Sequence, residues 1–313
     1  MTTLRADTPP PAAHRATSPM LVLALSLVGI SLAAPLIRLS TADALVIATW
    51  RLGFSMLIVG GALFIGRGWR EYAGLRASEY AFALGAGVLL ALHFWAFNAS
   101  LRYTSVAASV ALVNLQPVLI AAASALWLSE PPSRRQWIGV AIAVVGALVV
   151  GAADVPGGLG GLQAALVGGG SRALFGDLLA LIGAVTAAGY YLIGRRLRRR
   201  LGLWPYVALV YGAAFVTCVA LALLTHRPLA PQLPRELAIF AGLAIGPMLL
   251  GHTGMNWALG HLPAFVVNLT TLGEPVGATL LAALLPGIHE VPGALTLGGG
   301  VLVLGGVLLA ARK

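Results

Sequence analysis

The sequence predicts an all-α polytopic membrane protein in which ten transmembrane helices form two inverted five-helix repeats around a central cavity. Its 313 residues are 59% hydrophobic and only 10% charged, with a mean hydropathy of +0.91, whereas soluble domains carry about 25% charged residues. The apolar residues form long uniform runs, unlike the short alternating segments of a membrane β-barrel. The stretch from Asn98 to Pro117 also returns in the same register from Asn256 to Pro275, which indicates an internal duplication.

The predicted spans follow from the lengths of the apolar runs, because about twenty apolar residues cross a bilayer. They lie at residues 20–37, 43–66, 79–100, 105–128, 135–152, 174–194, 204–224, 236–258, 263–286 and 293–311. The chain accordingly divides into a disordered cytoplasmic tail (1–18), a first repeat (19–152), a glycine-rich extracytoplasmic linker (153–173) and a second repeat (174–313).

The positions of the basic residues predict how these spans are oriented. Most arginines, including the run from Arg195 to Arg200, fall in loops on the side that holds both termini, and positive charge favours the cytoplasmic side. We therefore expect a multi-pass protein of a bacterial inner membrane with both termini in the cytoplasm. Because each repeat has an odd number of spans, the second is inverted relative to the first. That arrangement is typical of secondary transporters, whose substrate site lies near the midplane.

An ordered set of motifs resembles the EamA-type transporters of the drug/metabolite transporter superfamily. The first repeat contains Thr49-Trp50-Arg51, then FNASLRYTSVAASVALVNLQPVLIAAASALWLSE and QWIGVAIAVVGALVVGA. The second contains GDLLALIGAVTAAGYYLIGRRLRRRLG, NWALGHLPAFVVNLTTLGEPVGATLLAALL and GGGVLVLGGVLLAA. The resemblance covers about residues 20–311 and implies two inverted five-helix repeats. It also implies export of small metabolites, amino acids among them, by alternating access.

Charged and amide side chains inside the spans are the first candidates for a substrate site. Glu274 falls near the midplane, where a carboxylate is costly and therefore a functional candidate; it could bind an ammonium group, carry a proton or form a structural ion pair. Arg51 is the only basic residue inside a predicted span and needs an anion or a wet cavity. Glu274 and a substrate carboxylate are its possible partners, and a structural clamp is the alternative. Gln116 is the counterpart of Glu274 in the first repeat.

Further candidates come from histidines, aromatic residues and prolines. His93 and His252 occupy nearly equivalent places in the two repeats and could titrate, although a single such histidine is more often a hydrogen-bonded core residue. Trp95 could line the cavity or anchor a span end, and approximate symmetry places Tyr211 opposite Arg51. The prolines near the middle of the fourth and ninth spans free backbone groups that need partners, so they serve either as hinges or as packing kinks. These two residues are Pro117 and Pro275.

Two sets of small or polar residues favour structural roles. Asn98 and Asn256 recur near span ends and more often bond backbone there than touch a substrate. Small residues on the fifth and tenth spans form packing faces, either within the bundle or in a dimer. These are Gly139 and Gly146 on the fifth span and Gly298 and Gly305 on the tenth.

Several functional classes lack support in the sequence. The net charge of +10 would suit nucleic acid, but arginines in short loops between apolar runs are a membrane-topology signal, so we expect no nucleic-acid partner. The single cysteine, Cys218, has no partner for a metal pair, and we expect neither a metal nor a cofactor. No Gly-x-Ser-x-Gly motif or pair of intramembrane aspartates occurs, so we do not expect an enzyme.

Two transport functions remain. One cavity with a carboxylate and an arginine matches the charges of a zwitterion, which favours export of amino acids or similar small metabolites. The alternative is export of lipophilic or quaternary-ammonium cations, for which Glu274 and aromatic walls would suffice. The expected partners are a small-molecule substrate and the lipid bilayer. Whether transport is coupled to protons, and whether the protein is a monomer or a homodimer, stays open.

Overall fold

The computed structural model describes residues 18–103, 109, 112–129, 131–153, 170–274, 276–277, 281 and 294–311. These residues form helices and the turns between them, and they contain no strand. All ten predicted spans contain helix in this part of the chain. Six helical segments are long and apolar enough, by length and composition, to cross a membrane: Pro19–Ile37, Ala44–Ile65, Ala77–Ser100, Leu174–Leu197, Leu203–Leu224 and Pro234–Ala258. The count of ten transmembrane helices stays a prediction.

The first half of the chain contains eight described helical elements. They are α1 (Pro19–Ser31), α2 (Ala33–Leu39), α3 (Ala44–Ile65), η1 (Gly68–Gly74), α4 (Ala77–Ser100), α6 (Gln116–Ala123), η2 (Ser124–Leu128) and α7 (Arg134–Ala153). Local chemistry fixes several of their ends. Asp43 caps α3 by accepting a hydrogen bond from the Leu45 amide at 2.9 Å. Pro19 begins α1. The first amide groups of a helix have no acceptor within it, so the amide hydrogen that proline lacks is not missed there.

The second half also contains eight described elements. They are α9 (Gly170–Leu197), α10 (Leu203–Leu224), α11 (Pro234–Leu243), η3 (Ala244–Thr253), α12 (Gly254–Ala258), α13 (Ala264–Leu269), η4 (Thr270–Gly273) and α15 (Ala294–Ala311). α11, η3 and α12 form one continuous apolar segment. Its middle, η3, is a π-helix that contains Pro247, consistent with a proline that cannot make the ordinary helical hydrogen bond.

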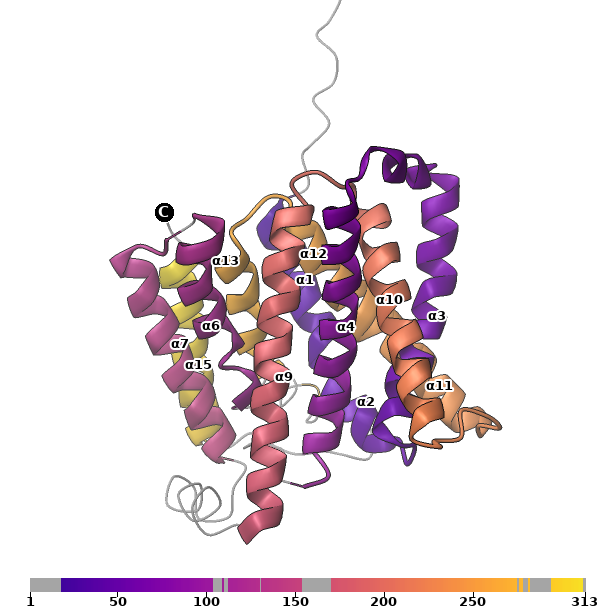
Figure 1. Ribbon diagram of the computed structural model, residues 1–313. Coiled ribbons are helices and arrows are strands. Elements are labelled where there is room, and N and C mark those ends of the chain that lie inside the picture. The colour runs from indigo at the N-terminus through magenta and orange to yellow at the C-terminus, as the bar shows by residue number, and fades with distance from the viewer. Residues whose placement is uncertain are drawn as a thin grey trace, which may run out of the picture.

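The two halves pack as a symmetric pair. The first-half helix α4 packs against α9 of the second half, and η3 and α12 of the second half pack against α1 of the first half in the equivalent way. The remaining equivalent helices pair with each other: α3 with α10, α6 with α13 and α7 with α15. In Figure 1, α1 and α2 descend from the upper face of the molecule, whereas the equivalent helix α9 ascends toward that face. We call this upper face, where α1 begins, the N-terminal face, and we call the other the opposite face.

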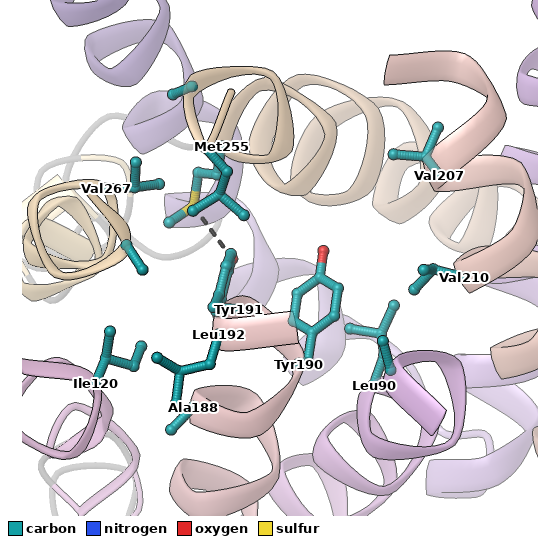
Figure 2. Packing of buried hydrophobic residues seen from close by; sticks show 14 of the residues in the cluster. Leu90, Ile120, Ala188, Tyr190, Tyr191, Leu192, Val207, Val210, Met255 and Val267 are labelled. Atoms are coloured by element: carbon teal, nitrogen blue, oxygen red, sulfur yellow. Dashed lines mark hydrogen bonds between the residues drawn. The ribbon is translucent and has the colours of Figure 1, made fainter. Parts of the chain in front are cut away.

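The buried core is continuous across both halves. Tyr190 and Tyr191 are neighbours on α9, and both are almost completely buried. Figure 2 shows Leu90 and Val210 on the Tyr190 side of this pair, while Met255 approaches Tyr191. The tyrosines therefore fill the space where α4, α9, α10 and α12 meet.

Close helix packing explains two of the glycines on the predicted packing faces. A Cβ atom on Gly139 would lie 2.6 Å from the Gly306 carbonyl oxygen, and one on Gly146 would lie 2.6 Å from the Val303 amide nitrogen. Both contacts join α7 to α15 within the bundle. On Gly305 a Cβ atom would meet nothing within 4 Å, and the same is true of Gly298. The two glycine faces of the prediction are therefore not equivalent.

Some predicted features differ or lie outside the described residues. α9 begins at Gly170, inside the predicted linker. The fourth span was expected to bend at Pro117 in its middle, but Asn114 and Leu115 form a turn and a new helix, α6, begins at Gln116. Pro117 therefore occupies the first turn of a helix, where proline is well tolerated. Pro275, the tail 1–17 and residues 154–169 of the linker lie outside the described residues.

Candidate functional site

A cavity at the meeting point of both halves contains most of the predicted site residues. The free volume inside it is about 40 Å³, enough for water molecules but smaller than a typical small-molecule site. Five of the predicted residues line it, namely Arg51, His93, Gln116, His252 and Glu274. Other lining residues are Ile30, Ala33, Phe94, Phe97, Val113, Asn114, Tyr191, Pro247 and Thr271. The polar residues of five spans thus converge on one space.

Arg51 is the most unusual residue of this cavity. It lies on α3, is only 4% exposed, and holds its guanidinium carbon 4.0 Å from the centroid of the Phe94 ring. Two of its nitrogens, Nε and Nη2, are buried and have no hydrogen-bond partner. A buried cation without an anion is strongly unfavourable, and the face of an aromatic ring compensates only in part. The guanidinium therefore has unused hydrogen-bond donors inside the cavity.

Gln116 and Glu274 come from equivalent spans of the two halves, and Gln116 begins α6, which packs against α13 of the other half. Glu274 follows η4 directly and lines the cavity together with Arg51. The two charges interact electrostatically, but among the ion pairs of the described residues none joins them, so the direct pairing considered from the sequence is not formed. Gln116 donates from Nε2 to the Thr271 hydroxyl at 3.1 Å. Its Oε1 atom is buried without a donor, as is Oδ1 of Asn114.

The two predicted histidines meet across the halves. The ring centroids of His93 and His252 are 6.3 Å apart in an edge-on arrangement. Nδ1 of His93 lies 2.9 Å from the Gly183 carbonyl oxygen, and because a carbonyl only accepts, this nitrogen carries the hydrogen. Nδ1 of His252 lies 3.2 Å from the Tyr191 hydroxyl, which also donates to the Met255 sulfur at 3.4 Å (Figure 2). Both imidazoles are thus fixed in orientation on the cavity wall.

Two predicted site residues do not reach the cavity. Tyr211 is fully buried, and its hydroxyl bonds the Thr253 hydroxyl at 3.0 Å. It interacts electrostatically with Arg51 from α10, which packs against α3, but it does not line the cavity. Trp95 packs in a small apolar cluster with Ala44, Ala99 and Leu179. Trp95 is two residues from His93, and side chains two positions apart on a helix do not face the same way.

Other lining residues were not selected from the sequence. For two of them the spacing to a predicted site residue on the same helix face could have identified them. Phe97 is four residues after His93, and Thr271 is three residues before Glu274, so each shares a helix face with a predicted site residue. Asn114 becomes available only because the chain turns just before α6, which the apolar sequence pattern does not show. In the described part of the chain, no group of three or more His, Cys, Asp or Glu residues could hold a metal ion.

Comparisons with known proteins agree with this architecture. A solved crystal structure, described only as that of a protein, resembles the chain with a TM-score of 0.74 at 20% sequence identity, covering 94% of this chain and 96% of that one. This likeness concerns the fold alone. None of the curated proteins matches the chain. The sequence model of the EamA-like transporter family matches residues 17–152 and 174–312, which are the two halves described above. The chain therefore belongs to the EamA-like transporter family.

Proposed function

We propose that this membrane transporter of small substrates exports amino acids or similar zwitterionic metabolites across a bacterial inner membrane by alternating access. Both termini lie in the cytoplasm in this proposal, in line with the excess of arginine in the loops of the N-terminal face. The substrate occupies the cavity between the inverted halves, where secondary transporters place it.

The observation that carries the proposal is the unpaired guanidinium of Arg51. Its two buried nitrogens without acceptors suit the planar, two-pronged geometry of a carboxylate. Glu274 lines the same cavity without a direct ion pair to Arg51 and is available for the ammonium group. A small zwitterion between the two would give each a direct partner of opposite charge, which would account for their sharing a cavity without an ion pair.

The alternative substrate class, lipophilic or quaternary-ammonium cations, fits the cavity less well. Aromatic faces bind such cations, and Phe94, Phe97 and Tyr191 line the space. However, the face of Phe94 is already occupied by Arg51 at 4.0 Å. A second cation beside it would be repelled by the guanidinium, which keeps its charge at any physiological pH.

Counterflow in liposomes tests the proposal. Liposomes that contain the purified protein are loaded with an unlabelled mixture of amino acids, and a labelled neutral amino acid is added outside. We expect transient accumulation of label by the wild type and its loss in Glu274→Gln. Gln136→Ala is the matched control, because the Gln136 side chain accepts from the Ser133 amide at the start of α7, does not line the cavity, and its variant should transport normally.

Each outcome of this assay separates the hypotheses. Accumulation that Glu274→Gln retains would keep the substrate class and remove Glu274 from the binding site. No accumulation above empty liposomes, from protein shown to be folded, would contradict amino-acid transport. In that case the same liposomes are tested with a labelled quaternary-ammonium ion, whose accumulation would establish the alternative.

A further inference from the structure

Two buried carboxylates outside the cavity occupy equivalent places in the two halves. Glu79 is the third residue of α4, which begins the third span of the first half. Glu236 is the third residue of α11, which begins the corresponding span of the second half. They are 9% and 4% exposed, respectively. Neither has a part in the cavity described above.

Glu236 joins the halves at the opposite face. One of its oxygens accepts from the Ser40 hydroxyl at 2.5 Å. The other accepts from the Thr41 amide and the Thr41 hydroxyl, each at 3.0 Å. Ser40 and Thr41 follow α2 in the first half, whereas Glu236 belongs to the second. We call this set of bonds the Glu236 contact.

Glu79 joins the halves at the N-terminal face. Its carboxylate forms an ion pair with Arg200, which follows α9 in the second half, and it also accepts from the Arg76 amide at 2.9 Å. Nearby, Glu71 accepts from the Gly202 amide at 2.7 Å. We call the ion pair between Glu79 and Arg200 the Glu79 contact.

The two contacts are counterparts under the symmetry of the fold. In each, a carboxylate at the start of the third span binds the loop that follows the first span of the other half. In Figure 1 the start of α4 and the end of α9 lie at the upper face, whereas α2 and α11 lie near the lower face. One molecule therefore carries an inter-half contact of a carboxylate at each of its two faces, an ion pair at one and a set of hydrogen bonds at the other.

We propose that Glu79 and Glu236 are positioning residues for transport, each holding the halves together at one face while the cavity opens at the other. This proposal rests on the alternating access of the proposed function. Opening the cavity at either face separates the loop after the first span of one half from the third span of the other half. The contact at that face must then break, while its counterpart keeps the second face closed. Removing one contact shifts the population toward opening at its own face.

Labelling of a single cysteine in the cavity tests this. Cys218 is the only cysteine and is buried, so Cys218→Ala gives a cysteine-free chain. Val113→Cys then places one thiol on the cavity wall, distant in sequence from both contacts. A membrane-impermeant maleimide is added to intact cells or to inside-out vesicles, so that each face is probed separately.

We expect the two equivalent substitutions to act in opposite directions. Glu236→Gln should raise the labelling rate from the α11 side about tenfold, the effect of one hydrogen bond to a charged group, and lower it from the other side. Glu79→Gln should do the reverse. Should either variant fail to fold, removing the partner groups by Ser40→Ala with Thr41→Val, or by Arg200→Gln, tests the same contacts.

Gln136→Ala is again the control, since its hydrogen bond lies within one half, and it should leave both rates unchanged. A shift in the same direction for both carboxylate variants, or no shift in either, would overturn the proposal and leave Glu79 and Glu236 as helix-start residues. The assay uses no substrate. If amino-acid counterflow fails, the labelling result still stands on its own. If labelling is unchanged while counterflow is normal, the proposal for Glu79 and Glu236 is wrong and amino-acid transport is unaffected.

Discussion

The guanidinium carbon of Arg51 lies 4.0 Å from the centre of the Phe94 ring, inside a cavity where two of its nitrogens have no acceptor. A cation over an aromatic ring gains about 2 kcal/mol or more when both are desolvated. Burying the ion costs several kcal/mol. The ring therefore holds the guanidinium in place without neutralising it.

Replacing Arg51 should weaken binding of the carboxylate. For Arg51→Gln we expect the concentration that gives half-maximal counterflow of a neutral amino acid to rise by about tenfold or more, because hydrogen bonds to charged groups contribute about 1.5–3 kcal/mol. The measurement is competition by unlabelled substrate in liposomes. An amino-acid amide lacks the carboxylate. In the wild type it should inhibit uptake of the labelled amino acid much less than the parent amino acid does, and in the variant this difference between amide and amino acid should disappear.

A matched change on the ring separates charge from position. Phe94→Leu removes the aromatic face but leaves the guanidinium. We therefore expect the concentration that gives half-maximal counterflow to rise less than it does for Arg51→Gln. If Arg51→Gln retains its preference for the carboxylate over the amide, Arg51 does not bind this group and acts as a structural clamp.

The imidazole pair gives a prediction about energy coupling. His93 and His252 line the cavity with ring centroids 6.3 Å apart, and histidine is the side chain best suited to exchange protons near neutral pH. We expect the double variant His93→Asn with His252→Asn to retain counterflow, which needs no energy source. It should lose the accumulation driven by an acidic liposome interior.

The wild type must respond to the same gradient for that comparison to hold. Gradient-driven accumulation that persists in the double variant would show that the imidazoles are fixed wall residues, as their bonds to Gly183 and Tyr191 allow. A wild type that never responds to the gradient would indicate facilitated transport without protons.

The sequence was most informative where a polar side chain interrupts an apolar run. Arg51, His93, Gln116, His252 and Glu274 all reach one cavity because a polar group that faced lipid would be costly. The same reasoning holds for Asn256, which donates to the His252 carbonyl oxygen at 2.8 Å. This backbone bond is the role expected for it from the sequence.

Symmetry and local breaks were harder to predict. The repeat placed Tyr211 opposite Arg51, and the two residues do interact electrostatically, but the Tyr211 hydroxyl bonds Thr253 and Tyr211 does not line the cavity. The turn at Asn114 has no signal in apolar periodicity. Glu79 and Glu236 were not selected because each lies near a span end, where a carboxylate in the first turn is unremarkable in a sequence.

High pH should lower the stability of the folded protein through Tyr72, which lies at the N-terminal face. Its hydroxyl donates to the Pro205 carbonyl oxygen at 3.1 Å, and burial, together with Tyr80 and Glu71, raises the pKa of Tyr72 to about 12. The folded state therefore holds this proton more tightly than the unfolded state, whose pKa is about 10. The stabilisation is complete below pH ~10 and is lost as the pH rises toward 12.

The measurement is the melting temperature of the purified protein across that pH window. We expect the wild type to lose more stability than Tyr72→Phe between about pH 10 and pH 12. Parallel curves for the two proteins would show that Tyr72 does not contribute, and that the loss comes from groups elsewhere.

Two glycines on the α7 and α15 pair should respond to alanine with opposite signs. A Cβ atom on Gly139 would lie 2.6 Å from the Gly306 carbonyl oxygen and 2.8 Å from the Ala310 amide nitrogen, both of them backbone atoms that cannot move alone. Gly139→Ala must therefore separate α7 from α15, and such overpacking costs about 1–3 kcal/mol. On Gly305 the added Cβ meets nothing within 4 Å.

Gly305→Ala should accordingly stabilise the protein by about 0.5–1 kcal/mol, since alanine favours a helix over glycine. Thermal unfolding of the two variants in the same detergent measures the difference. Because both variants replace a helical glycine by alanine, the intrinsic helix preference of alanine is the same in both and cancels. Equal shifts would show that α7 and α15 are not in close contact. Destabilisation by Gly305→Ala would instead indicate that this face of α15 packs against a second copy of the chain.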